Sequence, residues 1–168
     1  PVPVPTPTLI PSPSPSPSPS EGYFLSRTFG GNTDEINADN ALRFPTSVAF
    51  RNDGANNYIF VSDMGKGRFA RFDTSGTYAG QQWFAGDFGK SHFKPADIAV
   101  NGGYLYVSFT CDTGSSPSSE VWRIDLSNGN RDITGSFSMP VLGIGVVSSG
   151  LTLYATFDNG GTGLVQKY

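Results

Sequence analysis

The sequence contains few of the residues from which catalytic and metal centres are usually built. Its 168 residues include one cysteine and one histidine, so no internal disulfide framework can form. A zinc site would need Cys111 and His92 together with carboxylates, and no suitable spacing occurs. Cys111 is expected to behave as a small buried hydrophobe, with a bridge to another chain as the main alternative. His92 lies in a predicted loop and is expected to be solvated or structural. We therefore predict no catalytic residue, no metal site, no cofactor and no enzyme activity.

Charge is also scarce. Charged residues make up 15% of the chain, against about 25% in an average soluble domain. The net charge of −3 argues against a nucleic-acid surface, which would be basic. No run of about 18 apolar residues is present, so no membrane span is predicted. No signal peptide is visible, and the first residue is Pro1, from which we expect a processed or trimmed N-terminus.

Glycine and aromatic residues are abundant instead. The chain has 21 glycines, and aromatics reach 13% of its residues. Phe, Tyr, Val and Thr favour strands, and glycine favours tight turns. The composition therefore predicts an all-β domain, which we place at residues 21–168.

Residues 1–20 form a separate Pro/Ser-rich spacer. They hold nine of the thirteen prolines and no charged or aromatic residue. Each proline fixes its own φ and disfavours the helical region for the residue before it. The alternation predicts an extended polyproline II segment of roughly 60 Å, at about 3.1 Å per residue. A disordered linker is the alternative interpretation.

The repeated Ser-Pro run of this spacer resembles the hydroxyproline-rich glycoproteins of algal and plant cell walls and surface appendages. The resemblance implies hydroxylated, O-glycosylated prolines with glycosylated serines beside them. The candidate attachment sites are Pro11, Pro13, Pro15, Pro17, Pro19, Ser12, Ser14, Ser16 and Ser18. No Asn-x-Ser/Thr sequon occurs in the chain, so any glycan would be O-linked. An extracellular location follows from the resemblance.

The rest of the chain is repetitive. Pro45, Pro95 and Pro140 each precede a short apolar strand, a Gly-containing turn, a strand of aromatic and β-branched residues, a polar loop and an alternating strand. A fourth strand follows in the first two units. The units are predicted at residues 44–84, 94–137 and 139–168, with a single strand at 23–29 before them. Four short strands per 40 to 50 residues are typical of β-propeller blades.

The first unit resembles the NHL-repeat family in its Val61-Ser62-Asp63 strand end and its Arg71-Phe72-Asp73 strand end. The other units depart from the pattern, since Phe109 and Phe157 stand where the first has Asp63. The resemblance implies propeller-like blades. Some propellers of this type are lyases with metal-binding histidines near the axis, and the chain lacks those histidines.

Several acidic residues recur at strand ends. Asp73 and Asp125 each precede a turn at the same repeat position, which favours a structural role because Asp side chains bond turn backbone. Asp63 is expected to cap a loop. Calcium binding is a weaker alternative, and residues 32–40 lack the glycine and terminal glutamate of an EF-hand loop.

Three units are too few to close a ring of the usual four to eight blades. The chain is then a fragment of a longer propeller, or copies combine into one ring, or each copy's N-terminal strand completes a neighbour's open third unit and builds a filament. Strand addition or docking of the tail would provide the self-association.

Two functional hypotheses follow, with a third less favoured. The first is an extracellular structural glycoprotein, a subunit of a surface filament or cell-wall assembly built by self-association. The second is a stalk-displayed propeller that binds a glycan or protein partner through loops such as residues 111–119. The third, an NHL-type lyase fragment, would need histidines that this chain does not have.

Overall fold

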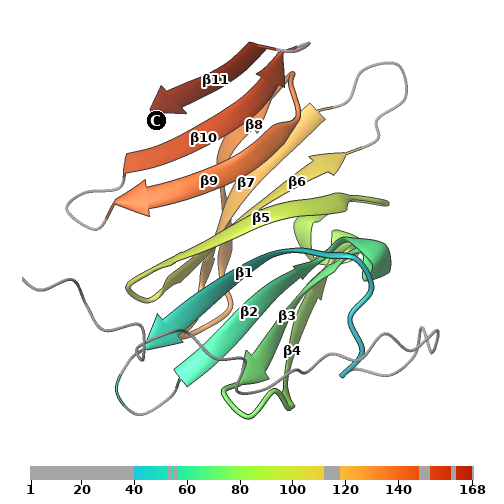
Figure 1. Cartoon of the computed structure of the whole chain (residues 1–168), viewed down its shortest axis with the longest axis vertical. Coiled ribbons are helices and arrows are strands. Elements are labelled where there is room, and N and C mark those ends of the chain that lie inside the picture. The colour runs from blue at the N-terminus through green and yellow to red at the C-terminus, as the bar shows by residue number, and fades with distance from the viewer. Residues whose placement is uncertain are drawn as a thin grey trace, which may run out of the picture.

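The computed structural model describes residues 40–52, 54, 57–111, 118–147, 152–159 and 162–167. These residues form three antiparallel sheets with two short 3-10 helices, so the predicted all-β class is confirmed (Figure 1). None of the helices in this part of the chain has the length and apolar character needed to cross a membrane. The predicted spacer at 1–20 and the predicted strand at 23–29 lie outside the described residues.

The first sheet has four strands in sequence order, and a 3-10 helix η1 (Met64–Lys66) joins its second and third strands. Its strands are β1 (Pro45–Asn52), β2 (Asn57–Asp63), β3 (Arg68–Asp73) and β4 (Tyr78–Phe84).

The second sheet repeats this arrangement after the 3-10 helix η2 (Ala85–Phe88). Its strands are β5 (Lys94–Asn101), β6 (Tyr104–Cys111), β7 (Ser118–Asp125) and β8 (Arg131–Phe137). The third sheet has the order β11-β10-β9 and consists of β9 (Val141–Val147), β10 (Thr152–Asn159) and β11 (Thr162–Lys167).

Turn chemistry explains the strand boundaries. The link from β5 to β6 is Gly102-Gly103, and Gly102 has φ 56°, a left-handed conformation that glycine adopts without strain. After β3, the Asp73 carboxylate accepts hydrogen bonds from the Ser75 and Thr77 N–H groups at 2.8 and 2.9 Å. The turn after β7 repeats this pattern, with Ser127 N–H donating to Asp125 at 2.8 Å. The structural role predicted for the two acids is confirmed.

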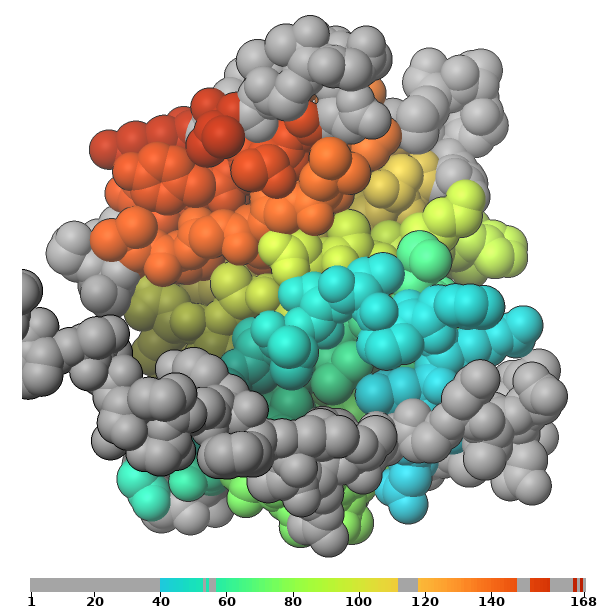
Figure 2. All heavy atoms as spheres, in the orientation of Figure 1, coloured from blue at the N-terminus to red at the C-terminus, as the bar shows by residue number. Residues whose placement is uncertain are grey.

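The three sheets lie in a row, and their first strands β1, β5 and β9 are neighbours in space. Figure 1 shows these strands side by side, and Figure 2 shows the matching bands of cyan, yellow-green and orange on one face. Within the described residues the row is open, and the sheets do not close into a ring. The predicted three units therefore exist as sheets, while closure into a propeller is not established.

Two apolar clusters fill the spaces between neighbouring sheets. The cluster between the first and second sheets includes the fully buried Phe60, Phe69 and Phe109, with η2 contributing Phe88. The cluster between the second and third sheets is centred on five buried residues, Val121, Val141, Leu153, Ala155 and Phe157. A third cluster of Leu42, Val61, Ala70 and Phe72 lies on the face of the first sheet that points away from the second.

The backbone repeats more closely than the sequence does. In each sheet the pairing between the first two strands shifts register once, at the start of the first strand. After the shift, Ser47 pairs with Ser62, Asp97 with Ser108 and Gly143 with Thr156. These bulges fix which residues of the three sheets are equivalent.

Candidate binding groove and polar networks

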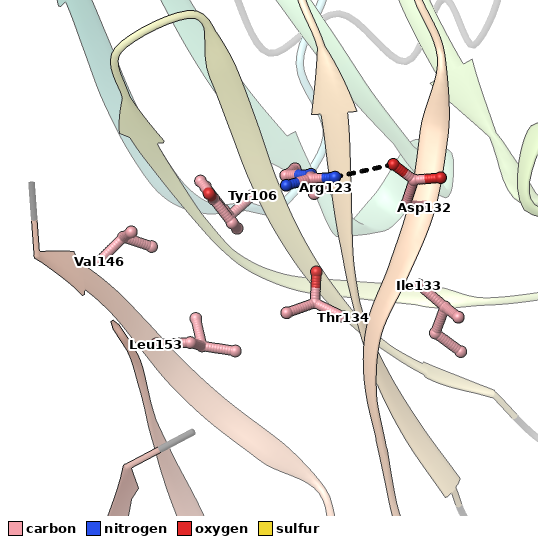
Figure 3. Close-up of a pocket in the computed structure, with 7 residues that line it drawn as sticks. All are labelled: Tyr106, Arg123, Asp132, Ile133, Thr134, Val146 and Leu153. Atoms are coloured by element: carbon pink, nitrogen blue, oxygen red, sulfur yellow. Dashed lines mark hydrogen bonds and ion pairs between the residues drawn. The ribbon is translucent and has the colours of Figure 1, made fainter. Parts of the chain in front are cut away.

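A groove opens between the second and third sheets, with a volume of about 230 Å³. Three strands of the second sheet and two of the third contribute to it (Figure 3). Its lining residues are Tyr106, Arg123, Asp132, Ile133, Thr134, Val146 and Leu153.

The charges in this groove are already paired. The Arg123 guanidinium donates a hydrogen bond to Asp132 at 2.9 Å, and its Cζ lies 4.9 Å from the centre of the Tyr104 ring. The hydrogen bond to Asp132 is the main cause that raises the pKa of Arg123. Val146 and the buried Leu153 supply the apolar side. Such a lining suits a neutral ligand with an apolar face and hydroxyl groups.

The contact of Arg123 with Tyr104 has a counterpart in the first sheet. There the Cζ of Arg71 lies 4.4 Å from the centre of the Tyr58 ring. Strand pairing places the two arginines at equivalent positions, because Phe60 pairs with Arg71 and Tyr106 with Arg123. Since the contact recurs in the first sheet, outside this groove, we interpret it as part of the repeat.

Asp97 lies where the first strands of the three sheets meet. Its carboxylate accepts a short hydrogen bond from the Ser47 hydroxyl of β1 and another from the Ile144 N–H of β9, at 2.6 Å. Its own N–H donates to the Ser108 hydroxyl at 3.0 Å. Beside it, the Thr46 hydroxyl donates to the Ala96 carbonyl at 2.8 Å. One half-buried carboxylate thus connects all three sheets.

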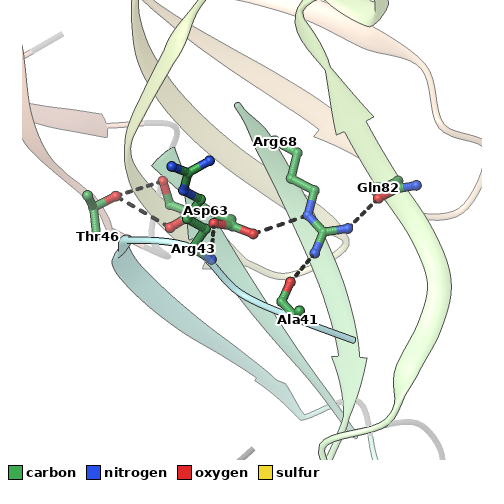
Figure 4. A network of polar contacts seen from close by, with 7 residues as sticks. Ala41, Arg43, Thr46, Asp63, Arg68 and Gln82 are labelled. Atoms are coloured by element: carbon green, nitrogen blue, oxygen red, sulfur yellow. Dashed lines mark hydrogen bonds and ion pairs between the residues drawn. The ribbon is translucent and has the colours of Figure 1, made fainter. Parts of the chain in front are cut away.

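A buried ion pair supports the entry of the chain into the first sheet (Figure 4). Asp63 and Arg68 lie 3.2 Å apart with side chains 0% and 3% exposed. Asp63 also accepts the Arg43 N–H at 2.8 Å, and it makes no side-chain cap hydrogen bond to η1, so the side chain that was predicted to cap a loop at its own strand end bonds the segment before β1 instead. Arg68 donates further to the Ala41 carbonyl and to Gln82, at 2.8 and 2.6 Å. The pair therefore holds the segment before β1 against the sheet.

His92 and Cys111, the residues that the sequence analysis weighed for metal binding, take no part in the polar networks around Asp97 and Asp63. His92 is exposed in the loop before β5, and Cys111 is 2% exposed within the cluster between the first and second sheets. The burial predicted for Cys111 is confirmed. Groups of three or more His, Cys, Asp or Glu side chains that could hold a metal ion do not occur among the described residues. The nine candidate glycosylation residues lie outside them.

Sequence reasoning missed the groove and the linking role of Asp97. The groove combines residues from five strands of two sheets, and no local spacing reports such a combination. A signal for the Arg–Tyr contact was present in the repeated Arg-x-Asp strand ends at Arg71 and Arg123. For Asp97 the sequence offers only an acid after a proline, and its partners lie 50 and 47 residues away.

Comparison with known proteins gives no relative from which a function could be transferred. No family model matches the chain, and no curated protein matches it with significant similarity. The function has to be argued from the residues alone.

Proposed function

We propose that this chain is an extracellular structural glycoprotein, a subunit of a surface filament or cell-wall assembly formed by self-association. The observation that supports this best is the incomplete third sheet. It has three strands where its neighbours have four, so the outer edge of β11 is unpaired among the described residues. Bare edges of this kind are templates for strand addition, and natural proteins usually cover them.

In this proposal the three sheets are blades of a propeller-like repeat of the NHL type. Support comes from the strand order, the recurring bulges and the adjacency of β1, β5 and β9. The strand predicted at residues 23–29 would serve as the fourth strand of an incomplete third sheet, in the same or in a neighbouring copy. The strand count then reaches four in every sheet.

The Ser-Pro spacer gives the proposal its extracellular and glycosylated character. Sugar attached to residues 11–19 would stiffen an already extended segment and keep it in solvent. The paired charges of the groove and the turn-bound Asp73 and Asp125 are consistent with a protein whose polar residues serve structure.

Peptide mass spectrometry of native material across residues 1–20 tests the proposal. We expect prolines that carry an added oxygen and a ladder of attached sugars on the candidate residues. Sedimentation of the same material should give species larger than the 17.9 kDa chain. Unmodified prolines together with a monodisperse monomer would overturn the proposal.

The groove favours a second candidate, a stalk-displayed propeller that binds a glycan or protein partner. Its hydroxyl groups and the apolar Val146 and Leu153 suit the two faces of a sugar ring. A glycan array probed with the full chain and with Thr134→Arg, which would fill the groove, tests this reading. Binding that the substitution abolishes supports it, and no binding to any glycan removes the glycan form of it.

A further inference from the structure

A second depression lies beside the two short helices and has a volume of about 350 Å³. Its walls come from three segments, which are the end of η1 with Gly67, the end of β4 with the start of η2, and the loop before β5. Figure 1 shows both helices on the side of the molecule where β5 begins. The depression shares no lining residue with the groove between the second and third sheets. We call it the His92 pocket.

The polar lining of the His92 pocket consists of hydrogen-bond donors. Lys66, Ser91 and His92 line it, and among the described residues that do so none is acidic. The whole chain has a net charge of −3, so a pocket edged only by basic and hydroxyl side chains departs from the average of the chain. An ammonium group offers three donors, and its hydrogen bonds to an oxyanion are stronger than those between neutral groups. The lining therefore favours an anionic ligand.

The acids closest to η2 in the polar contacts are bonded to other cations. The Asp87 carboxylate accepts a hydrogen bond from the Arg131 guanidinium at 2.9 Å. The Glu120 carboxylate accepts one from the Lys90 ammonium at 2.6 Å. Neither Arg131 nor Lys90 lines the His92 pocket. The positive character of the pocket is thus kept apart from these two carboxylates.

The apolar lining of the His92 pocket is aromatic. Phe84 is 43% exposed at the end of β4. Phe93 is buried, and its ring lies 5.6 Å from the centre of the Phe69 ring and 4.8 Å from that of Phe109. One aromatic wall is therefore open to a ligand and the other is anchored in the core. An aromatic wall beside a few polar groups is the usual composition of a small-molecule site.

Backbone hydrogen bonds hold the walls of the pocket in place before any ligand binds. The Gly67 N–H donates to the Met64 carbonyl at 3.1 Å, and the Lys90 N–H donates to the Ala85 carbonyl at 3.0 Å. Gly86 keeps the space open, because a Cβ built on it would meet no atom within 4 Å. A preformed pocket of this kind loses little conformational entropy when it binds a ligand.

We propose that the His92 pocket binds an acidic sugar, a ring that carries a carboxylate or a sulfate group. Lys66 and His92 bond the oxyanion, Ser91 bonds a ring hydroxyl, and the exposed ring of Phe84 packs on the C–H face of the sugar. Acidic sugars occur as repeating units of polysaccharides, so the site would attach the chain to an acidic polysaccharide. This function is additional to self-association and does not depend on it, and it uses a different site from the groove.

A sugar matches the pocket better than a small inorganic anion does. An inorganic anion would use only the donors and would leave the exposed face of Phe84 in water. It would also fill only part of a depression of about 350 Å³. A neutral sugar would use the aromatic wall and leave the cationic groups without a counter-charge. Only a ligand with both a ring and an oxyanion uses every part of the lining.

Isothermal titration calorimetry of the full chain tests the proposal with three sugars. The probes are a galacturonic acid trisaccharide, a sulfated galactose trisaccharide and the neutral galactose trisaccharide as the matched control. At least one acidic probe should bind at least about tenfold more tightly than the neutral probe, which is the expected effect of one hydrogen bond to a charged group. The tighter of the two acidic probes identifies the oxyanion, and inorganic sulfate is titrated as the small-anion control.

Variants of the chain place the binding in the pocket. Lys66→Gln and His92→Ala should each weaken binding of the acidic sugar by about tenfold. Gly86→Glu fills the open space with a carboxylate and should abolish binding. Lys167→Gln, which removes the same charge from an exposed position on β11, should bind like the unaltered chain. Thr134→Arg, which fills the groove, should retain binding, and thermal unfolding checks that each variant folds.

The outcomes are distinct. Preference for an acidic sugar that only the three pocket variants weaken supports the proposal. Equal affinity for the neutral sugar overturns it, and so does inorganic sulfate that binds as tightly as the sulfated sugar. A loss in Lys167→Gln as large as in Lys66→Gln shows general charge attraction and overturns it, as does the absence of any binding. A loss in Thr134→Arg alone moves the site to the groove. In all of these cases the proposed structural function stands, because mass spectrometry and sedimentation test it separately.

Discussion

Replacing Asp97 should loosen the whole row of sheets, since its carboxylate is bonded to two other sheets at once. Asp97→Ala removes the acceptor for the Ser47 hydroxyl and for the Ile144 N–H. A hydrogen bond to a charged group contributes about 1.5–3 kcal/mol, and half-burial places each of these near the lower end. We expect the free energy of unfolding to fall by about 3 kcal/mol, the sum of two such bonds.

Two milder variants calibrate this value. In Asp97→Asn the amide oxygen can accept the Ile144 N–H while the amide nitrogen donates to the Ser47 hydroxyl oxygen, so only the charge is lost. Neutral hydrogen bonds contribute about 0.5–1.5 kcal/mol, which makes the expected loss about 1–2 kcal/mol. Ser47→Ala removes one of the two bonds and should cost about 1.5 kcal/mol.

Urea unfolding of the full chain, followed by tryptophan fluorescence, measures these losses. Trp83 is 3% exposed in the cluster between the first and second sheets and reports on that packing. A loss of about 3 kcal/mol corresponds to a Tm lower by roughly 6–12 °C for a domain of this size. If Asp97→Ala is as stable as the unaltered chain, or if Asp97→Asn is as costly as Asp97→Ala, the carboxylate does not connect the sheets as argued.

Three further predictions concern the first sheet. A Cβ on Gly65 would lie 2.4 Å from a backbone carbonyl oxygen. Gly65→Ala should therefore lower the free energy of unfolding by about 1–3 kcal/mol, measured by thermal unfolding. Gly86→Ala is the control and should be neutral, because the space around its Cβ is open. Asp63→Asn leaves the buried Arg68 guanidinium without its counter-charge and should cost about 3–5 kcal/mol by urea unfolding; a loss below 1 kcal/mol would contradict this. The Ser75 hydroxyl bond, followed by backbone N–H bonds, lowers the pKa of Asp73 below 3.8. The carboxylate therefore stabilises the fold fully above its unfolded pKa, and this contribution is lost as pH falls through the lower folded pKa. Asp73→Asn should flatten the acid limb of a stability-against-pH curve, and an unchanged limb would refute the assignment.

The sequence was sufficient for features whose causes are local. The aromatic and β-branched residues that follow the Gly-containing turns predicted strands close to β2 and β6, and both are observed. Asp73 and Asp125 were predicted to bond turn backbone, because an Asx side chain reaches its own loop whatever lies around it. Asp63 was predicted as a local cap as well, but its side chain bonds the Arg43 N–H 20 residues away and makes no cap hydrogen bond to η1.

Features that depend on how sheets meet could not be predicted in this way. Arg68 belongs to none of the motifs that the sequence shows. Its partners Ala41 and Gln82 lie 27 and 14 residues away in the chain. The pairing of Arg123 with Asp132 depends on the register of β7 with β8, which includes a bulge. Since a bulge changes which face a side chain occupies, spacing alone does not give the register.

In the third unit, the sequence alignment and the strand pairing disagree about which residues are equivalent to those of the second unit. Alignment on the prolines matches Pro140 with Pro95 and Leu142 with Asp97. Strand pairing instead puts Val141 in the place of Pro95, since the two residues face Phe157 and Phe109 respectively.

The position of Asp97 then belongs to Gly143, where a Cβ would lie 2.9 Å from the Thr156 hydroxyl and 3.5 Å from the Asp97 carboxylate. In the third unit, Gly143 thus stands where the second unit has Asp97. Having no side chain, Gly143 leaves room for the bond from the Asp97 carboxylate to the Ile144 N–H. A repeat in which Asp97 bonds backward to Ser47 and forward to Ile144 needs only one such acid for three sheets. An acid at the equivalent position of the third unit is therefore not needed for these two bonds.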